Sequence, residues 1–129
     1  MNPTMPVAVF EIKEYMVILR QNEERVFGGV NAKIRGVVRC SGKGQQPKAG
    51  EDYRLEIFFL APDSAFPEPQ IDLEANNGQL FFPMSDLMTV VDILRYEKPI
   101  YGHLRGDRPS WTSITTTNEP VGEGATDES

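Results

Sequence analysis

Apolar residues recur every second position along most of the chain, but in one stretch the period lengthens to that of a helix. The spacing i, i+3, i+4 and i+7 holds for Leu87, Val90, Val91 and Leu94. Ser85 stands where it can cap the helix N-terminus, and Pro99 stops the helix at the other end. The pattern predicts one helix at about residues 85–96.

The rest of the ordered chain reads as strands. From Val30 to Ser41 the even-numbered residues are mostly apolar or small and the odd-numbered ones mostly polar, which is typical of a strand with one face in water. Tyr15–Leu19 and Ile57–Leu60 are apolar at every position, which favours strands that are covered on both faces. Asn77-Gly78 supplies the residues of a two-residue hairpin turn.

These patterns predict a mainly β fold: a small antiparallel β-barrel or sandwich of about seven strands, with the helix inserted before the last two. The apolar stripe of the helix must pack on the sheet. The residues expected at this docking site, or at an interface between subunits, are Tyr15, Val17, Phe58, Leu60, Leu87, Val90, Val91 and Leu94. A helix of three turns covers only part of such a sheet, so we expect the uncovered apolar surface to form a homodimer.

Residues 1–117 are expected to form a single domain, and residues 118–129 an acidic tail that lacks the apolar residues needed to order itself. The tail contributes −4 to the net charge of −6. One cysteine and one histidine allow no internal disulfide and no structural zinc site, and no metal or other cofactor is predicted. No apolar run approaches the length of a membrane span, which favours a soluble, cytoplasmic protein.

A basic segment stands out against the acidic whole. Between Arg25 and Gly50 there are six basic residues and no acidic one. The candidate anion-binding residues are Lys33, Arg35, Arg39, Lys43 and Lys48, of which the first three are expected on the outward face of one strand. They could bind an anionic small molecule or a nucleotide, because arginine matches such groups bidentately. The alternative is ordinary cross-strand pairing with Glu11, Glu14 or Glu56. Nucleic acid is disfavoured as a ligand, since no aromatic residue is interleaved with these basic residues.

Catalytic chemistry has one candidate centre, His103 beside Tyr101, because the chain contains no second histidine. Cys40 falls among apolar residues and reads as a core residue. The sequence therefore favours a non-catalytic, bacterial-type small β-domain that acts by association, as a homodimer or with a protein partner. The alternatives are an anion-binding domain using the basic segment and an enzyme centred on His103.

Overall fold

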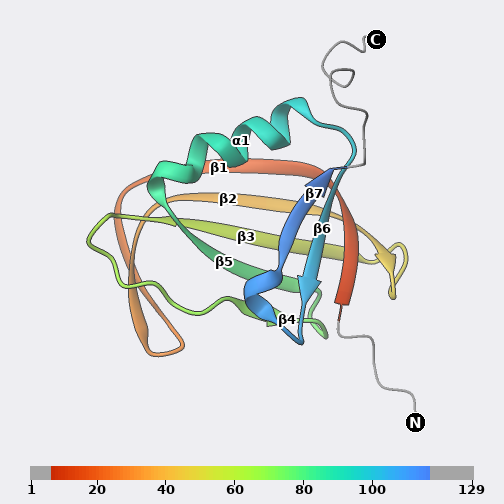
Figure 1. Ribbon diagram of the computed structural model, residues 1–129, viewed down its shortest axis with the longest axis horizontal. Helices are drawn as coiled ribbons and strands as arrows, with labels where there is room; N and C mark the ends of the chain where they lie inside the picture. The colour runs from red at the N-terminus through yellow and green to blue at the C-terminus, as the bar shows by residue number, and fades with distance from the viewer. Residues whose placement is uncertain (1–6, 117–129) are drawn as a thin grey trace.

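The computed structural model describes residues 7–116, which form one sheet of seven strands and a single α-helix (Figure 1). The strands are β1 (Val7–Phe27), β2 (Val30–Gln46), β3 (Asp52–Leu60), β4 (Gln70–Asp72), β5 (Asn77–Pro83), β6 (Ile100–Arg105) and β7 (Ser113–Thr116). Two 3-10 turns, η1 (Met84–Asp86) and η2 (Pro109–Trp111), accompany the helix α1 (Leu87–Tyr96). The acidic tail lies outside the described residues.

The mainly β prediction is confirmed, with the helix before the last two strands. The strand order is β4-β5-β3-β2-β1-β6-β7, so β4 and β7 are the ends of the sheet and the sheet does not close. The predicted terms, barrel and sandwich, therefore describe this open sheet only loosely. None of the helices among the described residues has the length and apolarity needed to cross a membrane.

One strand pair departs from the expected antiparallel order. β5 runs parallel to β3, whereas the other neighbouring strands are antiparallel. Three prolines, Pro62, Pro67 and Pro69, keep the connection after β3 out of regular structure while it crosses back along the sheet. β5 consequently starts at the same end as β3.

The predicted turn at Asn77-Gly78 is wrong, because both residues belong to β5. The chain turns instead over residues 73–76, where Asn76 adopts a φ of 59°. The carboxylate of Asp72 accepts hydrogen bonds from the backbone N–H groups of Glu74 and Ala75, so an Asx-type turn reverses the chain before the Asn-Gly pair is reached.

The helix forms where its apolar period predicts, and the four residues of the stripe are buried. Its start differs from the prediction, because η1 leads directly into α1 and Asp86 occupies the N-cap position. Neither η1 nor α1 has a side-chain hydrogen bond at its N-terminus, so Ser85 does not act as the cap. Burial of the stripe, rather than capping, holds the helix in place.

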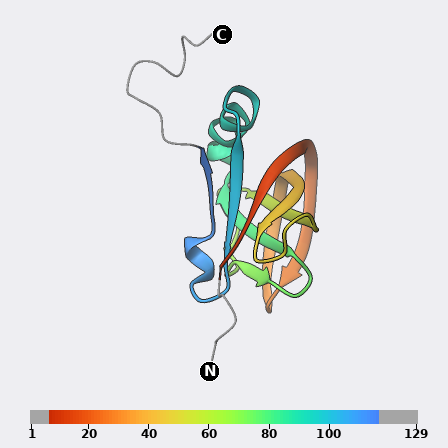
Figure 2. The same ribbon diagram turned by 90° about the vertical axis from the view of Figure 1, so that its right-hand side faces the viewer.

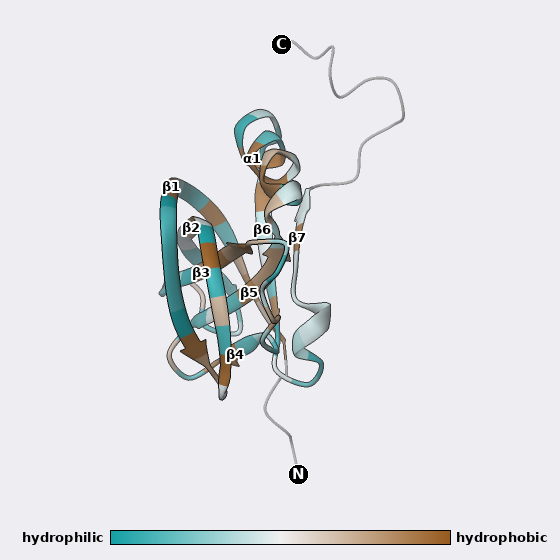
Figure 3. Cartoon of the chain, turned by 90° about the vertical axis from the view of Figure 1, so that its left-hand side faces the viewer, coloured by the Kyte–Doolittle hydropathy of each residue, from teal (hydrophilic) through white to brown (hydrophobic). Residues whose placement is uncertain are grey.

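The apolar side chains form two cores on opposite faces of the sheet. The inner core joins α1 to β1, β2, β3, β5 and β6, and Figure 3 shows hydrophobic residues gathered where the helix and the strands meet. The outer core forms where the tip of the β1–β2 hairpin folds over the other face, and the ring centroid of Phe27 lies 5.1 Å from that of Phe58 and 4.8 Å from that of Phe81. Phe58 and Leu60 belong to this outer core, so the prediction that they dock the helix is wrong.

A bulge in β2 explains why residues of this one strand belong to both cores. Ile34 lies opposite Leu60 and Gly36 opposite Phe59, which leaves Arg35 as an extra residue. Ala32 and Ile34 therefore join the outer core, while Val38 and Cys40 join the inner one. The single inward face expected for this strand is split between two cores.

β1 is packed closely between its neighbours where it passes from β2 to β6. A Cβ added to Gly42 would overlap the carbonyl oxygen of Glu11, and one added to Gly102 would overlap the ring of Phe10. Only glycine fits at these two positions, and the close approach lets the sheet coil so that β6 and β7 form a second layer (Figure 2).

Val91 and Thr89 test the docking of the helix. Val91 is 5% exposed in the inner core and Thr89 is exposed. Val91→Asp buries an unpaired charge and is expected to lower the free energy of unfolding by about 3–5 kcal/mol, whereas Thr89→Asp should change it by less than about 0.5 kcal/mol. Urea denaturation measures both values. Equal tolerance of the two substitutions would contradict the docked helix.

Candidate interaction surface

β1 has a long edge that no strand of the described chain covers. It pairs with β2 from Val9 to Phe27, with a break between Leu19 and Glu23, but β6 pairs only with Val7 to Glu11 on the other side. Lys13 is an extra residue in β1, and the sheet bends there, so β6 separates from the rest of the strand. From residue 12 onward the side of β1 that faces away from β2 is unpaired. The strands at the two ends of the sheet, by contrast, have only three and four residues.

The uncovered edge carries exposed apolar side chains, which we call the β1 patch: Met16, Val17 and Leu19, with exposed fractions of 54%, 41% and 69%. Val17 lies opposite Val38 and faces inward, whereas Met16 lies opposite Arg39 and faces outward. Both faces of the same edge are thus apolar. Tyr15, expected at an interface or under the helix, is half-buried against the inner core.

α1 runs along this edge, on the side of β1 away from β2 (Figure 1). At one end the sulfur of Met84 approaches Gly36, the β2 residue opposite Leu19. At the other end Arg95 lies beside Tyr15, and donation from its guanidinium to the hydroxyl oxygens of Tyr96 and Tyr15 raises the pKa of the guanidinium. The helix is therefore antiparallel to β1. A groove of about 470 Å³ lies between residues 11–15 of β1 and residues 94–100.

Most charges along this edge are already neutralised. Lys13 contacts Glu11 at 3.1 Å, and Arg20 contacts Glu23 at 2.9 Å. Glu14 is exposed and forms no ion pair within residues 7–116. It is the carboxylate on this edge that is left for a partner.

The basic segment is largely engaged in interactions within the chain. Arg39 Nε donates to Glu56 Oε2 at 3.0 Å, the cross-strand pair that the sequence offered as an alternative to ligand binding. Lys33 contacts Asp63 at 2.8 Å, and Lys43 contacts Asp52. Each of these cations has a carboxylate beside it, which weakens its attraction for an external anion.

Lys48 and Arg35 differ from the rest of the basic segment. Lys48 donates to the carbonyl oxygens of Leu73 and Glu74 and to the side chain of Asn76, which ties its loop to the β4–β5 turn. Arg35 is the exposed bulge residue. The prediction of a common face is also wrong, because the bulge places Lys33 and Arg39 on opposite sides of the sheet.

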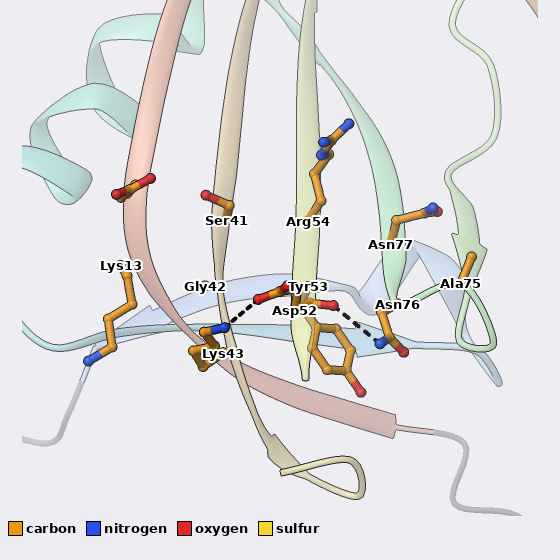
Figure 4. Close-up of a pocket in the computed structure, with 11 residues that line it drawn as sticks. Lys13, Ser41, Gly42, Lys43, Asp52, Tyr53, Arg54, Ala75, Asn76 and Asn77 are labelled. Carbon is orange, nitrogen blue, oxygen red and sulfur yellow. Dashed lines mark hydrogen bonds and ion pairs between the residues drawn. The ribbon is translucent and has the colours of Figure 1, made fainter. Parts of the chain in front are cut away.

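A polar depression of about 570 Å³ lies on the outer face, beside the β1 edge (Figure 4). Arg54 is exposed there, between its cross-strand neighbours Ser41 and Asn77, and forms no ion pair with a described residue. Sequence reasoning missed Arg54, because it lies among acidic residues beyond the basic segment. The signal that could have found it is its outward position on the alternating strand that starts at Tyr53.

His103 is a half-buried residue of β6 whose Nε2 lies 2.9 Å from the Thr115 hydroxyl. Burial, and then the charge of Arg105, lower its pKa. Cys40 is buried in the inner core, and burial raises the pKa of its thiol to about 12. Within the part of the chain that the structure describes, no three metal-ligating side chains come together.

Comparison with protein-family models, with curated proteins and with solved structures finds no match to this chain.

His103 makes the stability of the domain depend on pH. Its folded pKa lies below the ordinary value of 6.5, so the unfolded chain binds the proton first as the pH falls. The free energy of unfolding is expected to decrease as pH drops through 6.5 and to level off below the folded pKa. His103→Gln keeps a hydrogen-bonding side chain without the charge and should flatten this dependence. Urea denaturation from pH 5 to 8 measures it, and an unchanged slope in the variant would contradict the assignment.

Proposed function

We propose that this protein acts by association with polypeptide chains, a second copy of itself among them, and not by catalysis. The observation that carries the proposal is the long unpaired edge of β1 with its exposed apolar side chains, Met16, Val17 and Leu19. Monomeric proteins seldom leave such an edge open, because it is a template for pairing with another chain. Natural sheets protect their edges by shortening them, as β4 and β7 do here.

The homodimer expected from the sequence is the first form of association to measure. The exposed side chains of the β1 patch, without strand pairing, give it a location, since apolar surface in a homodimer interface is removed from water. Leu19 is the most exposed member of the patch, and a charge placed there would have to be desolvated on association.

Sedimentation velocity of the full chain at micromolar concentrations tests the homodimer. We expect a species of twice the chain mass of 14.5 kDa. Leu19→Glu should shift the protein to monomer. Val26→Glu is the matched control, since Val26 is 62% exposed on the same strand but belongs to the hairpin tip. A wild-type monomer, or equal loss of dimer in the two variants, would overturn the homodimer at this patch.

A second candidate function is the binding of an anionic small molecule in the outer depression. Arg54 favours it, because its guanidinium has no carboxylate partner among the described residues and lies between the polar side chains of Ser41 and Asn77. The candidate site is then centred on Arg54 of β3, and Lys43 of the predicted basic segment also lies in its lining.

A thermal-shift screen with nucleotides tests this second function. Ligand at 100 times its Kd should stabilise the domain by about 2.7 kcal/mol, and Arg54→Gln should abolish the shift. Arg20→Gln, which removes a cation paired with Glu23, is the control. The absence of a shift, or equal loss in both variants, would count against the site.

A further inference from the structure

We propose that the unpaired edge of β1, from Glu14 to Arg20, binds an extended segment of another polypeptide as an additional antiparallel strand. The inference rests on the proposed role in association and names the kind of partner the edge takes. The strand would lie beside β1 on the side away from β2, in front of α1.

The first argument concerns the backbone. In an antiparallel sheet, alternate residues of an edge strand direct their N–H and C=O groups outward, where only water or another strand can satisfy them. β1 presents this pattern from residue 12 onward, because β6 pairs only as far as Glu11. The stretch from Tyr15 to Leu19 contains no proline and no charge, the two devices that would block an incoming strand.

The second argument concerns the side chains. An added strand would place alternate residues on the inner face beside Val17 and Leu19, and the others on the outer face beside Met16. Met88 of α1 is 60% exposed, one turn after Met84, which reaches β2 opposite Leu19. The helix therefore provides an apolar wall behind the inner side chains of the partner, and contacts to alternate side chains give specificity when a strand is added to an edge.

A folded second copy does not fit this edge as a paired strand. The two-fold axis that relates antiparallel edge strands is perpendicular to the sheet, so both copies would carry their helices on the same face. α1 lies alongside the edge itself (Figures 1 and 2). The two helices would compete for the same space, although helix axes approach no closer than about 8 Å. The occupant is consequently an extended segment with no helix behind it.

Charge defines the sequence of that segment. The edge carries Glu14, then five apolar residues, then Arg20. In an antiparallel pair centred on Val17, a matching strand has a basic residue opposite Glu14 and an acidic one opposite Arg20, with apolar residues between them. The unpaired carboxylate of Glu14 makes the basic residue the stronger requirement. A free peptide with the sequence of residues 13–21 has this pattern, because β1 is self-complementary in charge about Val17.

The test uses that peptide, with a fluorophore at its N-terminus, and measures the anisotropy on addition of the full chain. We expect saturable binding, because main-chain hydrogen bonds supply the affinity when a strand is added to a sheet edge. Two further peptides carry N-methyl groups on alternate residues, odd or even. N-methylation of one half of the residues should abolish binding, and N-methylation of the other half should leave binding unchanged. The reason is that only alternate amides of the peptide face the edge of β1. No binding, or equal binding by the two sets, would overturn strand addition.

Variants of the protein locate the site. Val17→Glu should weaken peptide binding by more than about tenfold, while Val26→Glu, on the hairpin tip, should leave it unchanged. Glu14→Arg should weaken binding of the parent peptide, and a peptide with glutamate in place of its arginine should restore it. Thermal denaturation verifies that each variant is folded. Loss of binding in Val26→Glu, or no restoration by charge reversal, would contradict the register.

The two proposals fail separately. Sedimentation of the chain alone reports self-association, whereas anisotropy reports the peptide. A monomer that binds the peptide retains strand addition and rejects the homodimer. A dimer that binds no peptide rejects strand addition and retains the homodimer.

Discussion

The close approach of β1 to both of its neighbours near Phe10 is the constraint on which the rest of the structure depends. Gly42 and Gly102 leave no room for a side chain on either side of the strand. Because β2 and β6 can both reach β1 there, the sheet coils at this point and forms two layers with the inner core between them. The bend at Lys13 then separates β6 from the remainder of β1.

The uncovered edge follows from that bend. Once β6 has separated, no described strand lies beside β1 beyond Ile12, and α1 runs alongside that edge without pairing with it. The helix can bury only its own stripe, so Val17 and Leu19 stay exposed on the inner side. The same geometry that closes the inner core therefore leaves the molecule with an apolar edge.

Local sequence patterns predicted the helix and the strands, but they did not predict which element packs on which face of the sheet. The helix at about 85–96 was predictable because its period of 3.6 cannot be mistaken for a strand. The apolar run Ile57–Leu60 correctly indicated cover on both faces, but the pattern carries no information on the cover itself, and the hairpin tip, not the helix, lies over Phe58. The bulge at Arg35 was invisible for a related reason: a one-residue insertion changes the face of every following side chain without changing the alternation.

The candidate surface was predictable in part. The apolar neighbours of Tyr15 and Val17 predict an interface or a helix-docking site there, but the sequence does not show that the strand edge beside them is unpaired, which depends on where β6 ends. The amide hydrogen-exchange rates of residues 14–19 in the free protein test that central claim most directly. An open edge predicts alternation, with amides that face β2 exchanging slowly and those between them exchanging fast. Uniformly slow exchange along the segment would show that the edge is already covered, and would contradict the account.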